Sequence, residues 1–164
     1  MNNRYPLKTF LTITLASLML ALSASAQDAP ATTPAADYGD FSSATLTSKA
    51  WDALGQKNYA LAIDFASKCI EMYSSQATEM QAGLTEPAPK ETASSLWALN
   101  DVGTCLFIRG QAYEAQGESK LALADYKKLV ADMSFAQTWD PKGWFWRPSD
   151  AAKQRITVVE FEAL

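Results

Sequence analysis

The stretch from Leu106 to Leu129 constrains the fold of this chain more than any other part of the sequence. Apolar and small residues recur there at spacings of three and four, which is the period of one face of an α-helix. Gly117 divides the stretch, and glycine readily takes the left-handed conformation that ends a helix. The sequence therefore predicts two helices joined by one tight turn. The pattern is carried by Leu106, Gly110, Tyr113, Gly117, Ala122, Tyr126 and Leu129.

The packing between these two helices can also be predicted. The small residues Gly110 and Ala122 let the two backbones approach, and Tyr113 and Tyr126 fill the space around the contact. This order of glycine, tyrosine, glycine, alanine and tyrosine resembles a tetratricopeptide repeat, whose unit is a helix–turn–helix. The resemblance implies an all-α fold in which antiparallel helical hairpins form a short right-handed stack.

A weaker copy of the pattern lies earlier in the chain, at about 43–76. Ser42 or Ser43 can cap its first helix, because a serine side chain accepts hydrogen bonds from the free N–H groups there. Ala50 and Ala53 stand where the repeat usually has glycine and tyrosine. We expect this copy to be repeat 1 and the stretch at about 103–136 to be repeat 2.

The two repeats are joined by more chain than the family usually has. The apolar stripe of the helix in repeat 1 continues to about Leu84, and Pro87 and Pro89 then forbid helix. We expect a turn at about 85–89, after which a new stripe leads from Lys90 straight into repeat 2 as one helix. Two long helices joined by a short turn predict an antiparallel pair, here called the extended central hairpin.

The only two cysteines, Cys69 and Cys105, lie equally far from Pro87 in the sequence. In an antiparallel pair folded at that proline, both cysteines stand at the same height. One interpretation is a disulfide, which would contribute roughly 4 kcal/mol in an oxidising compartment. The other is a pair of small buried thiols, since free cysteine is among the most buried residue types.

Residues 1–26 have the pattern of a secretory signal peptide. Arg4 and Lys8 precede an apolar run, and a small-residue cleavage site ends at Ala26. As a helix the apolar run spans about 20 Å, short of the roughly 30 Å hydrocarbon core of a bilayer. We therefore expect cleavage after Ala26, no stable membrane insertion afterwards, and a mature protein in the periplasm or outside the cell.

The mature chain is expected to be one helical domain at 43–164, behind a disordered linker at 27–42 that is rich in alanine, threonine and proline. The formal net charge of the whole chain is −4 and no basic cluster occurs, so nucleic acid is not an expected partner. The chain has no histidine, which removes the usual nucleophile systems and the commonest metal ligand. We expect no catalytic activity, metal or cofactor.

Between repeat 2 and a last helix at 148–163, a tryptophan-rich loop is expected at 137–147. Its centre, residues 140–143, reads Asp-Pro-Lys-Gly, which suits a type I turn. Pro148 suits the first turn of the last helix, which would cap the open end of the stack. The aromatic segment of this loop consists of Trp139, Trp144, Phe145 and Trp146.

Two interpretations of the aromatic segment remain open. The rings either cover the end of a small core or form a platform for sugar rings or a protein partner. Side chains two residues apart in an extended segment share a face, so Trp144 and Trp146 lie together while Phe145 takes the other face. We expect at least one of the two tryptophans to be partly exposed.

In tetratricopeptide repeats the binding groove is lined mainly by residues of the first helix of each repeat. Aromatic and amide side chains on such a surface suit recognition of a peptide, although the aromatic ones can instead pack against neighbouring helices. Carried over by register, the resemblance implies a partner-binding groove formed by Trp51, Leu54, Trp97, Asn100, Thr104, Phe107, Gln111 and Glu114.

These patterns favour a secreted or periplasmic protein–protein interaction module without catalytic activity. A further possibility is that the exposed edge of the short stack mediates self-association. The alternative is a glycan-binding accessory protein that uses the segment 139–146 and requires coplanar, exposed rings. The chain as a whole resembles exported bacterial tetratricopeptide-repeat proteins with a Trp-Asp-Pro-Lys-Gly-Trp-Phe-Trp segment. That resemblance implies a scaffold and no particular substrate.

Overall fold

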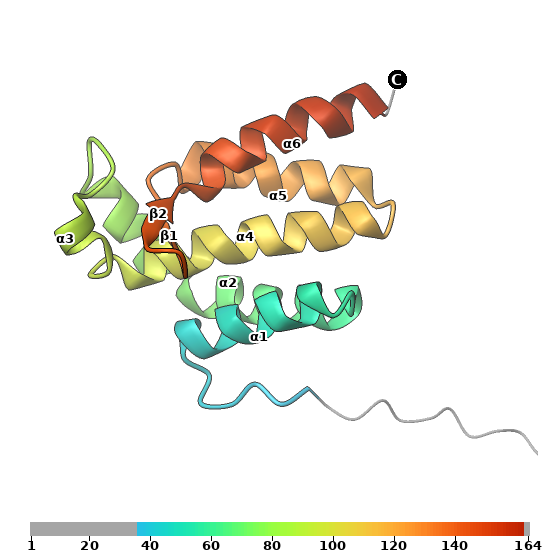
Figure 1. Cartoon of the computed structure of the whole chain (residues 1–164), viewed down its shortest axis with the longest axis horizontal. Coiled ribbons are helices and arrows are strands. Elements are labelled where there is room, and N and C mark those ends of the chain that lie inside the picture. The colour runs from blue at the N-terminus through green and yellow to red at the C-terminus, as the bar shows by residue number, and fades with distance from the viewer. Residues whose placement is uncertain (1–35, 163–164) are drawn as a thin grey trace, which may run out of the picture. The chain divides into compact units, whose positions relative to one another are not determined.

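The computed structural model describes residues 36–162, and these residues are mostly helical, which confirms the all-α class (Figure 1). The predicted signal peptide and residues 27–35 of the predicted linker lie outside the described residues. In chain order the elements are α1 (Ser43–Gly55), α2 (Tyr59–Ala82), α3 (Lys90–Ala93), α4 (Trp97–Ala115), α5 (Ser119–Asp132), β1 (Thr138–Asp140), β2 (Trp144–Trp146) and α6 (Pro148–Glu162).

Helix α4 lies at the centre of the helical stack and contacts α1, α2, α5 and α6 (Figure 1). Its burial reflects this position, because eleven of its residues are buried, from Ala98 to Ala112. Helices α2 and α4 pack against each other, with Ser67 bonded to Arg109 and Tyr73 against Trp97. The hydrophobic core follows α4 and is closed at one end by α6.

The two helical hairpins, α1–α2 and α4–α5, end their first helices with the same local structure. In each turn one residue has positive φ: Lys57 at +59° and Gly117 at +79°. The same two backbone hydrogen bonds close both turns. In the first turn Lys57 N donates to Leu54 O and Asn58 N donates to Ala53 O. In the second turn Gly117 N donates to Glu114 O and Glu118 N donates to Tyr113 O. The left-handed conformation expected of Gly117 is confirmed.

The close packing predicted between α4 and α5 is present at Gly110. A Cβ atom added there would lie 2.4 Å from Cε1 of Tyr126, far inside van der Waals contact. Tyr126 itself is fully buried, as is Ala122. Glycine is therefore needed at this position because the tyrosine ring lies directly on the α4 backbone.

The central hairpin differs in detail from the prediction. Helix α2 ends at Ala82 rather than at about Leu84, and the expected continuous helix from Lys90 is broken between α3 and α4. The Asn100 side chain donates from Nδ2 to the Ala93 carbonyl at 2.7 Å, which stabilises the bend. The backbone N–H of Leu96 also donates to that carbonyl, at 3.2 Å.

Residues 36–42 lie against the helices, although the sequence predicts them as part of the disordered linker. The Tyr38 hydroxyl donates to the Asp64 carboxylate of α2, at 2.9 and 2.8 Å from its two oxygens. The Tyr73 hydroxyl of α2 donates to the Phe41 carbonyl at 2.8 Å. Ser42 then caps α1 by accepting from the Thr45 N–H, as predicted. Two tyrosines thus fix a segment whose composition alone indicated disorder.

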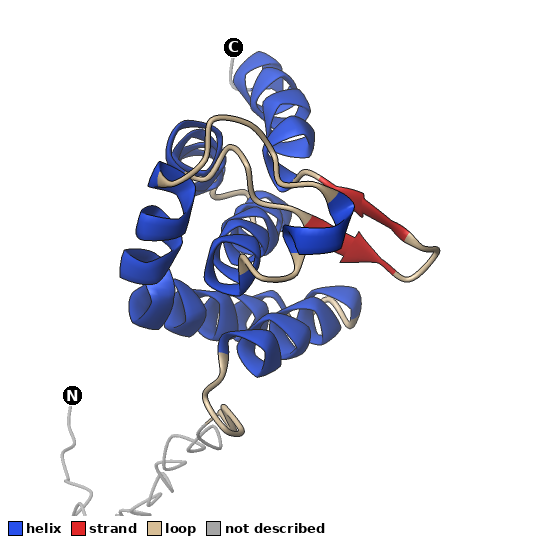
Figure 2. Ribbon diagram, turned by 90° about the vertical axis from the view of Figure 1, so that its left-hand side faces the viewer, coloured by secondary structure: helices blue, strands red, loops and turns tan. Residues whose placement is uncertain are grey.

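The tryptophan-rich loop contains a short antiparallel β-hairpin, which projects from the helices (Figure 2). Its turn closes with a hydrogen bond from Gly143 N to Asp140 O at 2.9 Å, the first-to-fourth bond expected of a β-turn. Helix α6 begins at Pro148, as predicted, and buries Ala152 and Val159. Among residues 36–162, no helix combines the length and hydropathy needed to span a bilayer.

The two cysteines lie side by side in the core between α1, α2 and α4, at the same height as predicted. Both are free thiols and fully buried. The Thr47 Oγ1 atom of α1 lies 3.2 Å from Sγ of Cys105 and 3.8 Å from Sγ of Cys69. The structure therefore shows the buried-thiol form, and the disulfide stays a prediction.

Candidate functional site

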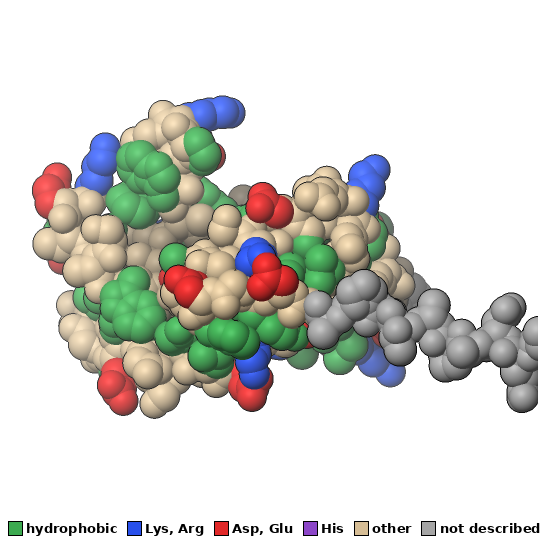
Figure 3. Space-filling model, turned by 90° about the horizontal axis from the view of Figure 1, so that it is seen from below, with side chains coloured by type: hydrophobic (Ala, Val, Ile, Leu, Met, Phe, Trp, Pro, Cys, Tyr) green, Lys and Arg blue, Asp and Glu red, His purple; other side chains and the backbone are tan. Residues whose placement is uncertain are grey.

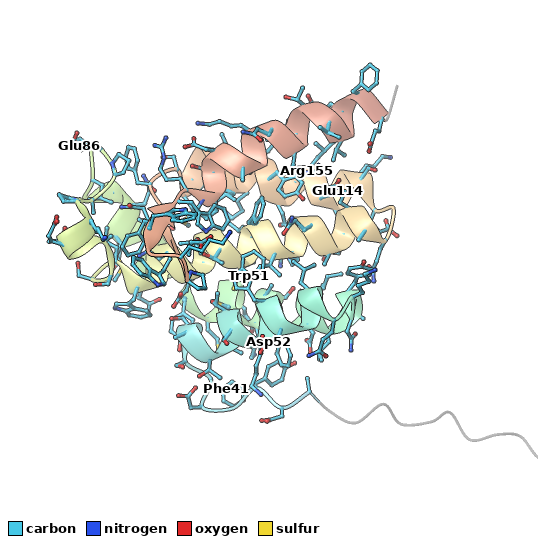
Figure 4. The ribbon with its side chains drawn as sticks, in the orientation of Figure 1. Phe41, Trp51, Asp52, Glu86, Glu114 and Arg155 are labelled. Carbon is cyan, nitrogen blue, oxygen red and sulfur yellow. The ribbon has the colours of Figure 1, made fainter. Side chains whose placement is uncertain are left out.

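A cavity of about 470 Å³ lies between α1 and the β-hairpin. Its lining comes from parts of the chain that are far apart in sequence: Trp51, Thr138, Trp139, Asp140, Pro141 and Trp146. Figure 4 shows Trp51 between α1 and α4, whereas the neighbouring Asp52 lies on the side of α1 away from α4. The lining is mainly indole, with one carboxylate.

Phe107 of α4 packs against Trp146, one of the residues that line the cavity. Its ring lies 5.5 Å from the Trp146 ring, centroid to centroid, with an edge-to-face angle of 72°. Phe107 is only 7% exposed and also contacts Tyr126, at 6.0 Å between ring centroids. Trp146 is therefore held in place by a chain of aromatic contacts that ends in the α4–α5 core.

Two of the residues predicted to line a groove instead hold the hairpin on α4. The hydroxyls of Thr104 and Thr138 share a hydrogen bond of 2.6 Å. The Asn100 Oδ1 atom accepts from the backbone N–H of Gln137 at 2.8 Å. These bonds fix the start of β1, so Asn100 and Thr104 position the cavity wall and are not free to bind a partner.

The strand pairing decides which tryptophans share a face. Thr138 pairs with Trp146 and Asp140 with Trp144, whereas Trp139 pairs with Phe145. Directly opposed residues point to the same face, and neighbours along a strand point to opposite faces. Trp139 and Trp144, each 49% exposed, therefore lie on opposite faces of the hairpin. The partial exposure expected for one of Trp144 and Trp146 is confirmed, but the three indoles do not form one flat platform.

The remaining predicted groove residues lie outside the cavity lining. Trp97 is 44% exposed and packs edge-on against Tyr73 of α2, at 5.6 Å between ring centroids. Leu54 and Gln111 are half-buried and do not border the cavity. Figure 3 shows the α1 side of the molecule, where apolar side chains lie among charged ones.

Glu114, also predicted for the groove, pairs with Arg155 of α6, and the two side chains meet between α4 and α6 (Figure 4). The Tyr126 hydroxyl donates to Glu114 Oε2 at 2.9 Å. Glu114 therefore joins three helices and holds the capping helix on the stack. Its acceptor oxygens are taken up by these contacts.

Lysines lie over the exposed indoles of the hairpin. The Nζ atom of Lys90 lies 5.7 Å from the Trp139 ring centroid, and that of Lys142 lies 5.9 Å from the Trp144 ring centroid. Both distances fall within the range of a cation–π interaction. Among the described residues, no such lysine or arginine is found over Trp51 or Trp146.

Displaced pKa values occur in the helical core. Burial raises the pKa of the Asp101 carboxyl, which accepts a hydrogen bond from the Ser43 hydroxyl at 2.5 Å. Burial likewise raises the pKa of the Tyr126 hydroxyl and of the Cys105 thiol. None of these three side chains borders the cavity. Their shifted pKa values therefore reflect burial in the helical core and not chemistry at the candidate site.

Sequence reasoning missed Thr138, Asp140 and Pro141 as lining residues and Arg155 as the partner of Glu114. Asp140 was recognised only as the first residue of a turn. Its Oδ1 atom does accept the Lys142 N–H at 2.8 Å, which is the local role of an aspartate in that position. Its place at the cavity depends on how the hairpin docks, and the sequence holds no signal for that.

Within residues 36–162, no three cysteine, aspartate or glutamate side chains gather in a way that could hold a metal ion. Comparisons of the chain with models of known protein families, with curated proteins and with solved structures give no match.

Proposed function

We propose that this protein is a tetratricopeptide-like interaction module that binds a segment of a partner protein in the cavity between α1 and the β-hairpin. The observation that carries the proposal is the cavity itself, which brings Trp51, Trp139 and Trp146 around one concave space. Tryptophan is enriched among the residues that dominate binding energy at protein interfaces. A recessed site of this kind suits one or two side chains of a bound segment.

The scaffold part of the proposal is supported by the internal repetition of the fold. The α1–α2 and α4–α5 hairpins share the same turn hydrogen bonds, and α6 follows α5 as the first helix of a third unit would. Short helical repeats generally need about three units to bury a continuous core. Two hairpins closed by a capping helix satisfy that need.

A binding role rather than catalysis is supported by the chemistry of the lining. The cavity offers indoles, one hydroxyl and one carboxylate, and the chain lacks histidine altogether. The one hydroxyl, that of Thr138, is hydrogen bonded to the Thr104 hydroxyl, and among the described residues no hydrogen bond joins it to the Asp140 carboxylate, so it is not arranged as a nucleophile activated by a base. We place the interaction in the cell envelope, on the strength of the signal-peptide pattern at residues 1–26.

Peptide display against the purified protein tests the proposal. We expect selected peptides to bind the unaltered protein and to lose at least tenfold in affinity with Trp51→Ala, since truncating a hot-spot residue costs about 2 kcal/mol or more. The matched control is Trp97→Ala, which removes a half-exposed tryptophan outside the cavity. Equal loss in both variants, or no selected peptide at all, would contradict the proposed site.

The glycan alternative is tested by a separate binding assay with soluble cell-wall or storage glycans. These glycans would bind the unaltered protein and be lost with Trp144→Ala, whose ring is half-exposed and does not line the cavity. Self-association has its own candidate surface on α6, where Phe161 is 76% exposed. Sedimentation of the protein with and without Phe161→Ser would reveal it as a change in mass.

A further inference from the structure

The cavity has the composition of a site for an organic cation. Three tryptophans, Trp51, Trp139 and Trp146, contribute to its lining, and the face of an indole carries the most negative π-surface among the aromatic side chains. Among the described residues the only charged one in the lining is Asp140, and no described lysine or arginine borders the cavity. Its apolar surfaces and its charge thus favour a positive group over a neutral or negative one.

Asp140 keeps one carboxylate oxygen available. Its Oδ1 atom accepts the Lys142 N–H, which fixes the side chain at the turn. Among the described residues no hydrogen bond or ion pair engages its Oδ2 atom. A cation in the cavity could therefore pair with a preoriented carboxylate, at little cost in side-chain entropy.

The hairpin already binds cations on its outer indoles. Lys90 lies over Trp139 and Lys142 over Trp144, so both half-exposed tryptophans hold an ammonium group of the same chain. Trp51 and Trp146 line the cavity without such a partner among the described residues. The protein is also acidic, with a formal net charge of −4, which favours the approach of basic segments.

We infer that the cavity takes the side chain of an arginine or lysine from the bound partner segment, with its cationic group between Trp51 and Trp146 and paired to Asp140. This inference rests on the proposed function and names the chemistry that the partner must supply. The cavity volume of about 470 Å³ lies within the range of ordinary ligand pockets, which admits one long side chain and its adjoining backbone.

The indole N–H signals of the protein give a direct test, because the chain has only five tryptophans. The probes are the N-acetyl methylamides of arginine, lysine and citrulline, the last being the neutral counterpart of arginine. We expect the arginine and lysine probes to shift the Trp51 and Trp146 signals. Citrulline should bind about tenfold more weakly, because its neutral side chain loses both the cation–π contact with the indoles and the charge pairing with Asp140.

Asp140→Asn is the sharpest variant, since asparagine keeps the Oδ1 acceptor for the Lys142 N–H and removes only the charge. We expect it to weaken the arginine probe about five- to tenfold and to leave citrulline unchanged. The matched control is Asp132→Asn, which removes a half-exposed carboxylate paired with Lys128 on α5. Added salt should weaken arginine binding to the unaltered protein.

The inference is overturned if citrulline and arginine bind equally, if Asp140→Asn has no effect, or if the probes leave the signals of Trp51 and Trp146 unchanged. The peptide display separates this failure from failure of the proposed function. Selected peptides that need Trp51 but contain no basic residue would support the interaction module and contradict its preference for cations. Selected peptides whose only shared feature is one basic residue would support both.

Discussion

At the scale of single residues, Gly110 sets how closely α4 and α5 can pack. An added Cβ atom would lie 2.4, 2.8 and 2.9 Å from three ring atoms of Tyr126. The ring cannot easily move, because Tyr126 is fully buried and its hydroxyl is bonded to Glu114. The close approach of the two helices therefore depends on the absence of one methyl group.

We predict that Gly110→Ala lowers the free energy of unfolding by about 1–2 kcal/mol. Overpacking a core costs about 1–3 kcal/mol, and the better helix propensity of alanine returns at most about 1 kcal/mol. Gly55→Ala in α1 is the control, because a Cβ atom there meets nothing within 4 Å. Urea denaturation should show Gly110→Ala destabilised and Gly55→Ala unchanged or slightly stabilised; a Gly110→Ala variant as stable as the parent protein would refute this packing argument.

The cysteines give a second prediction at this scale. Burial raises the pKa of the Cys105 thiol well above its ordinary value, and the neighbouring Cys69 raises it further, so little reactive thiolate forms. We expect a maleimide reagent at pH 8 to label neither cysteine in the folded protein and to label both after denaturation. Labelling that appears only after denaturation and reduction together would instead reveal the Cys69–Cys105 disulfide.

At the scale of the helices, one buried ion pair joins α2, α4 and α5. Arg109 donates to both carboxylate oxygens of Asp125, at 2.8 and 2.7 Å, and to the Ser67 hydroxyl at 3.0 Å. Burial opposes the charge of Arg109, but the hydrogen bond and charge of Asp125 outweigh it and raise the pKa of the guanidinium. Arg109 therefore stays charged, and its contacts specify the relative placement of three helices.

We predict that Arg109→Met lowers the free energy of unfolding by about 3–5 kcal/mol, because it leaves the Asp125 carboxylate buried without its partner. The double variant Arg109→Met/Asp125→Leu should recover much of that loss, since an apolar pair of similar volume needs no charge compensation. Urea denaturation of both variants measures the difference. A double variant that loses as much as the single one would show that the pair itself, rather than the stranded charge, carries the stability.

The helices and strands also show how much of the secondary structure can be predicted from local sequence. Periodicity and glycine chemistry were sufficient for the α4–α5 hairpin, because Gly110, Gly117 and Tyr126 act within neighbouring turns. The break before α4 was missed, since the bend depends on the Asn100 side chain bonding a carbonyl at Ala93. The β-hairpin was predicted as a loop with the correct turn, because three-residue strands are too short to show an alternating pattern.

At the scale of the whole molecule, the candidate site was only partly predictable. Trp51, Trp139 and Trp146 were singled out from the sequence and line the cavity, and Phe107, also singled out, packs against Trp146. Trp97 was placed with them by helical register, yet it lies against Tyr73. Register describes the surface of one helix, whereas the cavity is made by docking a distant hairpin onto it, which no periodic pattern encodes.

Asn100 connects these distant parts, and it gives a prediction for the molecule as a whole. Its Nδ2 atom donates to the carbonyl of Ala93, the last residue of α3, and its Oδ1 atom accepts from the Gln137 N–H before β1, so one side chain positions both segments. Asn100→Asp keeps the acceptor for Gln137 but cannot donate to Ala93, whereas Asn100→Leu removes both bonds.

We expect Asn100→Leu to expose the amides of β1 to hydrogen exchange and to weaken cavity ligands several-fold, although residue 100 does not line the cavity. Asn100→Asp should free α3 and leave the hairpin and ligand affinity nearly unchanged. Equal effects of the two variants on β1 would mean that other contacts, such as Thr104 with Thr138, hold the hairpin by themselves.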